Sequence, residues 1–372
     1  MRRVLTGNLT PEMSIARTIF SANGFPLLAA GTQLNDIYIR KLASLGINAI
    51  YVKTGMDKMI HVYDPVSERT KAEAIKALKK VFLEFAKTGK LRIDLISGHV
   101  NNIVDEALRN RKKVINTLDV RSMEDYLYGH CVNVCILAVL TAINMEYNEL
   151  QLRDIGLGAI LHDLGHMLVE KEILQKQSPL TPEEMAKIRK HCEYGFEPLR
   201  ELRNISLLSA HTAYQHHERF DGSGYPRGLR GHDTHEYARI VAICDVFDAM
   251  TMDRPYRRAY HPHEAMKLIT ETAGKLFDPE IVAIFKRIVA CYPAGDFIEM
   301  SSGEVGIICD HIKEQESCKT LALILLDKHK RPLVHAQEVV IKNSSEEIHR
   351  VLKDNDPLIQ LCYKLNDTES IE

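Results

Sequence analysis

The sequence predicts a mainly α-helical protein, in which an all-helical domain lies between two small β-rich modules. Apolar residues recur at helical spacing from about residue 65 to residue 294. Strand-like segments separated by turn residues occupy both ends of the chain. With 372 residues, 45% of them hydrophobic and 26% charged, the chain has the composition of a globular protein and a length that suits two or three domains.

These patterns place four parts along the chain: a β-rich N-terminal module (1–60), an amphipathic helical linker (61–120), the all-helical domain (121–294) and a β-rich C-terminal subdomain (295–372). The net charge of −2 provides no general basic field of the kind that binds a nucleic-acid polymer, so any anion site must be local.

Membrane insertion and secretion are not expected. The longest apolar candidate, residues 131–145, is shorter than the roughly 18 residues that span a bilayer and is interrupted by Asn133 and Asn144. The chain begins with MRRV, and no apolar stretch typical of a signal peptide follows. The eight cysteines include no C-x-x-C pair, and we expect core thiols in a reducing cytoplasm.

The N-terminal module carries no catalytic cluster and suits docking or interaction. We expect a hairpin over residues 14–29 with its turn at 22–24 (Ala-Asn-Gly), a short helix that Asn35 caps, and a last strand over 49–53. In the linker, apolar residues at helical spacing predict two amphipathic helices that pack on a neighbour or pair two protomers. A homodimer, or a protein partner bound through the linker or the β-rich modules, therefore stays open.

The all-helical domain should contain several buried helices. A capping box at residues 181–184 (Thr-Pro-Glu-Glu), with proline at the first helical position, begins a helix that is expected to carry His191. Apolar helices are expected over 155–161 and 240–250.

The C-terminal subdomain turns β-rich again. Strands are expected at 303–309, 321–327 and 337–341, with a short helix near 346–352.

Polar residues interrupt the apolar helices of the all-helical domain at seven places: His130, His162, Asp163, His191, His216, His217 and Asp245. Buried imidazoles and carboxylates cost free energy unless they are hydrogen-bonded, paired or bound to metal. A lone core histidine usually has a structural role, but so many on successive helices predict a metal site. Their nitrogen and oxygen atoms suit iron, manganese, zinc or nickel, and a carboxylate adjacent to a histidine can bridge two ions, as in phosphate-ester hydrolysis.

The stretch 215–258 combines part of this set with a cationic cluster. It holds two adjacent histidines, a Gly-Ser-Gly-Tyr-Pro turn and an apolar helix, and it ends with Arg254, Arg257 and Arg258. A planar guanidinium offers paired donors to phosphate oxygens, so the arginines predict a grip on an anionic substrate.

Several of these motifs together resemble the HD-GYP family, a branch of the HD phosphohydrolase superfamily. They are H-D-L-G (162–165), H-H-E-R-F-D-G-S-G-Y-P (216–226), the run from Ala238 to Arg257, Tyr128-Gly129-His130, and G-K-L-F-D-P (274–279). They follow one another in the family's order and spacing. The flanking β-rich modules also look like those found on some bacterial members.

The resemblance implies an HD-type helical domain that hydrolyses cyclic di-GMP to pGpG and then GMP. It implies two divalent ions per chain, iron or manganese, with the seven interrupting residues as ligands and Asp163 as the bridge. Tyr225 and Pro226 then belong to the loop at the site, and Arg254 and Arg257 fall where family members contact the nucleotide phosphate. The expected mechanism is in-line attack on phosphorus by a hydroxide that the two ions activate.

Three positions leave alternatives open. His166 stands where the family usually has lysine; it can donate a proton near neutral pH, or it marks reduced activity. Tyr126 stands where some members carry a glutamate that helps to hold a third ion, so we expect two. Asp248 either orients a ligand histidine or caps local structure. A weakly active receptor or adaptor, or an enzyme for another cyclic dinucleotide, are the alternative functions.

Overall fold

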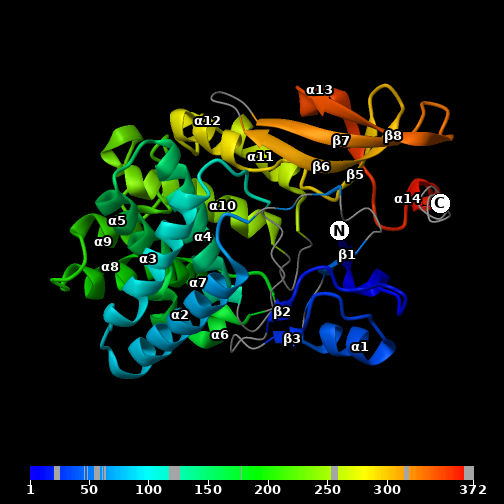
Figure 1. Ribbon diagram of the computed structural model, residues 1–372. Coiled ribbons are helices and arrows are strands. Elements are labelled where there is room, and N and C mark those ends of the chain that lie inside the picture. The colour runs from blue at the N-terminus through cyan, green and yellow to red at the C-terminus, as the bar shows by residue number, and fades with distance from the viewer. Residues whose placement is uncertain are drawn as a thin grey trace.

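The computed structural model describes most of the chain. It covers residues 1–20, 26–45, 47, 49–53, 59–60, 62, 64–116, 126–176, 178–252, 259–313 and 318–363. A helical body, coloured cyan to yellow in Figure 1, lies beside a small N-terminal module in blue and a C-terminal β-sheet in orange. The mainly helical fold with a β-rich part at each end is therefore confirmed.

The N-terminal module contains two short antiparallel strand pairs. One joins β1 (Arg2–Leu5) to β4 (Ala49–Val52), and the other joins β2 (Ile19–Phe20) to β3 (Pro26–Leu28). The expected hairpin is thus present as β2 and β3, and its turn at 22–24 lies outside the described residues. Nothing in the sequence pattern predicts β1, because arginines fill two of its four positions and the strand is defined by its distant partner β4.

The local signal at Asn35 gives the expected helix. The 3-10 turn η1 (Thr6–Asn8) follows β1, and α1 (Asp36–Ser44) begins at the predicted cap. The Asn35 side chain accepts a hydrogen bond of 2.8 Å from the backbone N–H of Tyr38, which satisfies one of the free donors at the start of the helix.

The helical body is built from eleven helices among the described residues. These are α2 (Glu68–Thr88), α3 (Asp94–Arg109), α4 (Tyr126–Asn144), α5 (Glu149–Ile160), α6 (Lys171–Leu174), α7 (Pro182–Arg189), α8 (His191–Arg200), α9 (Leu207–Gln215), α10 (Glu236–Thr251), α11 (Pro262–Glu271) and α12 (Pro279–Ile288). Two 3-10 turns, η3 (Leu164–Leu168) and η4 (Gly231–Asp233), lie between them.

Helix α4 lies at the centre of this body. It packs against α2, α3, α5, α10 and α12, and it is buried nearly all round. By length and composition it could cross a membrane, but 83% of its apolar window is buried inside the molecule. Its apolar sequence therefore has the pattern expected of a core helix.

Helices α2 and α3 share the core of α4. Leu78 and Phe82 of α2 and Ile96 of α3 are fully buried in one cluster with residues of α4 and α5. The two helices of the predicted linker are therefore part of the packed helical body as well as a connection between parts. The exact domain boundaries stay a prediction.

The helix that begins at the capping box is shorter than expected. Both bonds of the box between Thr181 and Glu184 are present, but α7 ends at Arg189. His191 begins a separate helix, α8, after Lys190. The predicted helix start is confirmed, and the prediction that the same helix carries His191 is wrong.

The C-terminal part is a five-stranded antiparallel sheet in the order β8-β7-β6-β5-β9. Its elements are β5 (Phe297–Met300), β6 (Val305–Lys313), β7 (Cys318–Leu326), β8 (Pro332–Ile341), α13 (Ser344–Glu347), β9 (Ile348–Val351) and α14 (Pro357–Tyr363). The short helix expected near 346–352 is wrong for most of its length. Ile348 and Val351 pair with β5 instead, because the sheet edge supplies a partner that local propensity does not reveal.

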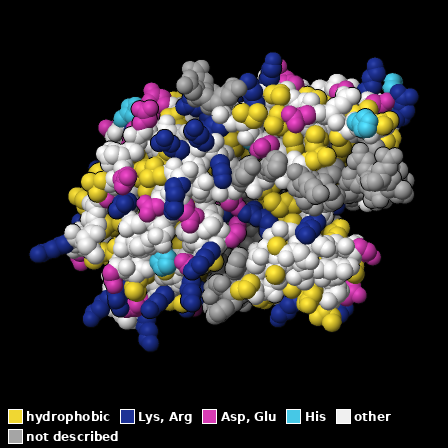
Figure 2. All heavy atoms as spheres, in the orientation of Figure 1, with side chains coloured by type: hydrophobic (Ala, Val, Ile, Leu, Met, Phe, Trp, Pro, Cys, Tyr) yellow, Lys and Arg dark blue, Asp and Glu magenta, His cyan; other side chains and the backbone are white. Residues whose placement is uncertain are grey.

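All eight cysteines are free, and six of them are buried, as expected for core thiols. On the face shown in Figure 2, basic and acidic side chains are interspersed over the helical body, in line with the net charge of −2.

A close contact joins η3 to α8. A Cβ atom added at Gly165 would overlap the carbonyl oxygen of His191 and would lie 2.6 Å from the backbone nitrogen of Gly195. Backbone atoms cannot move away as a side-chain end can. Only glycine at position 165 allows these two segments to approach so closely.

We therefore expect Gly165→Ala to lower the free energy of unfolding by about 2–3 kcal/mol, because overpacking forces backbone shifts. Gly98→Ala is the matched control, since no atom lies within 4 Å of a Cβ at this position inside α3. Alanine there should raise stability by about 0.5–1 kcal/mol. Urea denaturation of both variants measures the difference, and equal stabilities would contradict the close contact.

Candidate metal centre

The seven predicted ligands come together where five segments of the helical body meet. His130 lies on α4, and His162 and Asp163 lie between α5 and η3. His191 begins α8, His216 and His217 follow α9, and Asp245 lies on α10. Most of their side chains are buried; His217 is the most open of the seven, with 28% of its side chain exposed.

Three of the histidines are held in the same way. In His162, His191 and His216, Nδ1 lies 2.7, 2.8 and 2.9 Å from the carbonyl oxygen of the residue three positions earlier. A carbonyl only accepts, so Nδ1 must carry the hydrogen, and in the neutral ring Nε2 carries the lone pair. The three Nε2 atoms lie 3.3, 3.6 and 3.7 Å from the carboxylate of Asp163.

His130 is held by a carboxylate instead of a carbonyl. Its Nδ1 donates to Asp248 Oδ2 at 2.7 Å, and Asn133 donates to the other oxygen of Asp248 at 2.8 Å. Its Nε2 then faces Asp245 at 3.0 Å and Asp163 at 3.9 Å. Of the two roles considered for Asp248, this contact favours the orientation of His130.

The donor atoms divide between the two oxygens of Asp163. Nε2 of His130 and Nε2 of His162 lie nearest to Oδ2. Nε2 of His191 and Nε2 of His216 lie nearest to Oδ1. Asp245 groups with the first pair, and His217 groups with the second pair. This division is the arrangement in which one carboxylate can bridge two ions.

The ionisation states of His191, His216 and Asp163 suit metal binding. Burial, with neighbouring histidines, lowers the pKa of His191 to about 3 and holds the pKa of His216 well below its usual range. Both rings are therefore neutral near pH 7, which is the form that binds metal. Burial alone would raise the pKa of Asp163, but His162 and His166 outweigh it and hold that pKa well below its usual range. Burial disfavours charge on His130, but Asp245 and Asp248 raise its pKa.

A divalent ion fits this set of side chains. The Nε2 atom of His162 is buried and has no hydrogen-bond partner among the described residues, and a buried lone pair without a donor is costly unless a cation faces it. Neutral imidazoles and ionised carboxylates are ligands for divalent transition metals. The proposed ligands are the same seven residues that the sequence predicts.

Two cysteines lie closer to the centre than the sequence suggests. Cys192 Sγ is 3.5 Å from His191 Nε2, and Cys131 groups with His162 and Asp163. Burial raises the pKa of both thiols, with nearby carboxylates adding to the effect. A neutral thiol is a poor ligand, so the nitrogen and oxygen set remains the better candidate.

His166 lies beside the centre but is held differently from the three carbonyl-locked rings. Its Nε2 is 3.4 Å from Asp163 Oδ1, and its ring stacks on that of His191 with centroids 4.1 Å apart. Its Nδ1 is buried and has no hydrogen-bond partner among the described residues. No carbonyl fixes the proton of His166 on one nitrogen, so the ring is free to carry a proton on Nε2.

The loop that contains Tyr225 and Pro226 lies against the centre. The rings of Tyr225 and His217 have centroids 4.8 Å apart. Glu218 holds this loop, because its two carboxylate oxygens accept the backbone N–H groups of Arg227 at 2.8 Å and Leu229 at 3.0 Å. The sequence signal for this role was weak: Glu218 directly follows the paired histidines, but its partners lie nine and eleven residues further on.

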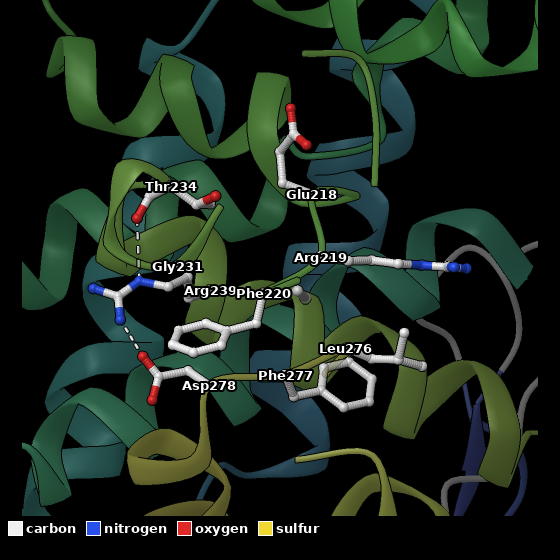
Figure 3. Close-up of a pocket in the computed structure, with 10 residues that line it drawn as sticks. Glu218, Arg219, Phe220, Gly231, Thr234, Arg239, Leu276, Phe277 and Asp278 are labelled. Carbon is white, nitrogen blue, oxygen red and sulfur yellow. Dashed lines mark hydrogen bonds and ion pairs between the residues drawn. The ribbon is translucent and has the colours of Figure 1, made fainter. Parts of the chain in front are cut away.

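Residues that line a small cavity connect the loop to α10 and α12. Figure 3 shows Arg239 of α10 between Thr234 and Asp278. The Arg239 guanidinium donates to the Thr234 carbonyl at 3.1 Å and pairs with Asp278, which also caps α12. Glu218 turns its carboxylate away from this cavity in Figure 3. The contacts of Arg239 in this cavity therefore support the loop.

Not every predicted site residue can be placed. Arg254 and Arg257, with the neighbouring Arg258, lie outside the described residues. Tyr126 is described, and its ring stacks on His130 with centroids 5.9 Å apart.

Comparison with known proteins gives matches over the same region. Residues 102–281 match the family described as HD domain. A cyclic di-GMP phosphodiesterase of Pseudomonas aeruginosa is 35% identical over 218 residues, which are 58% of this chain and 52% of that protein. A cyclic di-GMP phosphodiesterase of Thermotoga maritima is 31% identical over 256 residues, which are 68% and 65% of the two chains.

A third relative carries a different substrate name. A 3′3′-cGAMP-specific phosphodiesterase of Vibrio cholerae is 32% identical over 174 residues, which are 47% of this chain and 38% of that protein. This chain spans less than two thirds of the length of each of these three relatives. The match to the HD domain family includes the motifs at 162–165 and 216–226 and all seven proposed ligands, so residues 102–281 are an HD domain similar to that family.

Proposed function

We propose that this protein is a metal-dependent phosphodiesterase that hydrolyses cyclic di-GMP to pGpG and then to GMP. The observation that carries the proposal is the division of the donor atoms between the two oxygens of Asp163. It supports two divalent ions per chain, with iron or manganese as the expected metals. The names of the Pseudomonas and Thermotoga relatives support the substrate.

The bound ions would lower the pKa of a water molecule and neutralise charge that develops on the phosphate. The protein's own residues prepare this chemistry. The Nδ1 bonds of His162, His191 and His216 fix the three rings, so that in the neutral form each Nε2 lone pair is aimed at the centre. Asp248 orients the His130 ring in the same way. Burial keeps bulk water away from these groups, so little reorganisation is needed during the reaction.

His166 and the arginines complete the proposed mechanism. A proton on His166 Nε2, 3.4 Å from Asp163, would be available to the leaving oxygen of the substrate. We propose that Arg254 and Arg257 hold the substrate phosphate, as the resemblance implies. Tyr126 offers a phenol where a third ion would need a carboxylate, which supports two ions.

A second candidate substrate is a mixed cyclic dinucleotide, because one relative is named 3′3′-cGAMP-specific. The proposed metal ligands act on a phosphate group, which both substrates carry. Their geometry therefore does not distinguish cyclic di-GMP from 3′3′-cGAMP. Competition between cyclic di-GMP and 3′3′-cGAMP in one reaction, with both products quantified, decides the preference. Binding of either compound without turnover would instead support a receptor or adaptor.

We expect His162→Ala and Asp163→Ala each to abolish hydrolysis and to lower the metal content below about two ions per chain. Hydrolysis is followed as pGpG and GMP after anaerobic incubation with iron or manganese, and metal is counted by mass spectrometry. His329→Ala, in the exposed turn between β7 and β8, is the matched control and should keep both. Full activity in either variant would contradict the ligand assignment, and a count near three would contradict the two-ion proposal.

The Asp248→Ala variant tests the support of His130. Without the carboxylate, His130 Nδ1 loses its acceptor at 2.7 Å and the ring can rotate away from the ion. We expect metal affinity to fall by about 10–100-fold, the usual cost of losing an outer partner of a ligand histidine. Manganese titration of the variant and of Asp233→Ala, an exposed carboxylate on η4, measures the effect. Unchanged affinity would favour a purely local capping role.

His166→Lys tests the proton-donor role. Lysine keeps its proton to higher pH than imidazole does, so the variant should retain kcat at alkaline pH where the unmodified protein loses it. His166→Gln, which cannot donate a proton of this kind, should lower kcat by about 10²-fold or more. Identical pH–kcat profiles for the lysine variant and the unmodified protein would argue against the role.

A further inference from the structure

Arg189 lies where solvent meets the candidate metal centre. It is the last residue of α7 and is exposed. Its guanidinium carbon lies 4.9 Å from the centre of the Tyr225 ring, and that ring lies 4.8 Å from the ring of His217. Arg189 is exposed, Tyr225 and His217 are half-buried, and His191 and His216, whose rings contact His217, are buried. These contacts therefore lead from the surface into the centre.

The donors of Arg189 are free for a ligand. Within the described parts of the chain, its guanidinium has the ring contact and neither a hydrogen bond nor an ion pair. Arg200 of α8 also lies over an aromatic ring, that of Phe196 at 5.5 Å, but it pairs with Glu197 at 2.7 Å. Arg189 thus keeps all five N–H donors at its edges available.

A purely structural role explains Arg189 less well. A cation in the last turn of a helix interacts favourably with the helix dipole, but no bond from Arg189 to the final carbonyls of α7 is present among the described residues. The ring beneath Arg189 is also well fixed. Glu218 binds the backbone on the far side of Pro226, and the Tyr225 N–H donates to the His217 carbonyl at 3.2 Å. A fixed aromatic platform holds the flat guanidinium and leaves its edge open.

We propose that Arg189 binds the second, non-scissile phosphate of a cyclic dinucleotide. This inference rests on the proposed function. A cyclic dinucleotide carries two phosphodiester groups, and only one of them can lie at the centre during cleavage. The other needs a cation outside it, and a planar guanidinium matches phosphate oxygens with paired donors. Arg189 would thereby favour cyclic dinucleotides over diesters that carry one phosphate.

The test compares two substrates in three variants. Cyclic di-GMP has two phosphates, and bis(p-nitrophenyl) phosphate has one. For Arg189→Ala we expect the ratio of kcat/KM on cyclic di-GMP to kcat/KM on the single-phosphate diester to fall about tenfold, through KM, as for one solvent-accessible charge-assisted contact. Arg189→Lys should fall less, because it keeps the charge without the paired donors. The matched control Arg200→Ala should keep the ratio of the unmodified protein.

The outcomes separate this inference from the proposed function. An unchanged ratio in Arg189→Ala, with metal content and thermal stability preserved, overturns the role of Arg189 and leaves the proposed function intact. If the unmodified protein binds cyclic di-GMP without cleaving it, the proposed function fails. In that case the dissociation constant for cyclic di-GMP tests the role of Arg189. About tenfold weaker binding by Arg189→Ala supports the contact, and binding equal to that of the unmodified protein overturns it. Absence of both binding and cleavage overturns both.

Discussion

The carboxylate of Asp163 is the interaction on which the rest of the centre depends. It is buried, which by itself disfavours its charge, and the imidazoles around it outweigh that cost. Its two oxygens face different groups of nitrogen atoms, so five segments of the helical body must meet within a few ångströms. Gly165 permits one of these approaches, between η3 and α8. The packing of the helices around α4 therefore also sets the positions of the proposed ligands.

The loop around Tyr225 and Pro226 extends this arrangement to the surface. On one side Glu218 binds its backbone, and behind it Arg239 joins the loop to α10 and α12 through Thr234 and Asp278. Helix α10 also carries Asp245 and Asp248. The loop and the proposed ligands thus share one support, and a change in α10 would move both.

The two β-rich parts contact the helical body and each other. Arg17 pairs with Asp64 and with Glu68 at the start of α2. Asp64 lines a small pocket whose walls also include Asn133 and Asp248. On the other side, Lys313 of β6 donates to Asn144 at the end of α4, at 2.6 Å, and the N–H of Leu5 donates to Asp354 at 3.0 Å. The contacts of the N-terminal module at Asp64 thus lie close to Asp248, which binds His130.

Sequence patterns alone predict the helical class, the resemblance to HD-domain proteins, the caps at Asn35 and Thr181 and the seven proposed ligands. These features depend on local spacing, or on polar side chains placed where burial would be costly without a partner. The packed structure was needed to show that β1 and β9 are strands, that α7 ends before His191, and that Glu218 and Arg189 contact the loop at Tyr225. Their roles arise from atoms that are distant in sequence: a sheet edge, a backbone N–H nine residues away, or a ring on another segment. A local sequence pattern cannot predict such contacts, because they form only when the helices pack.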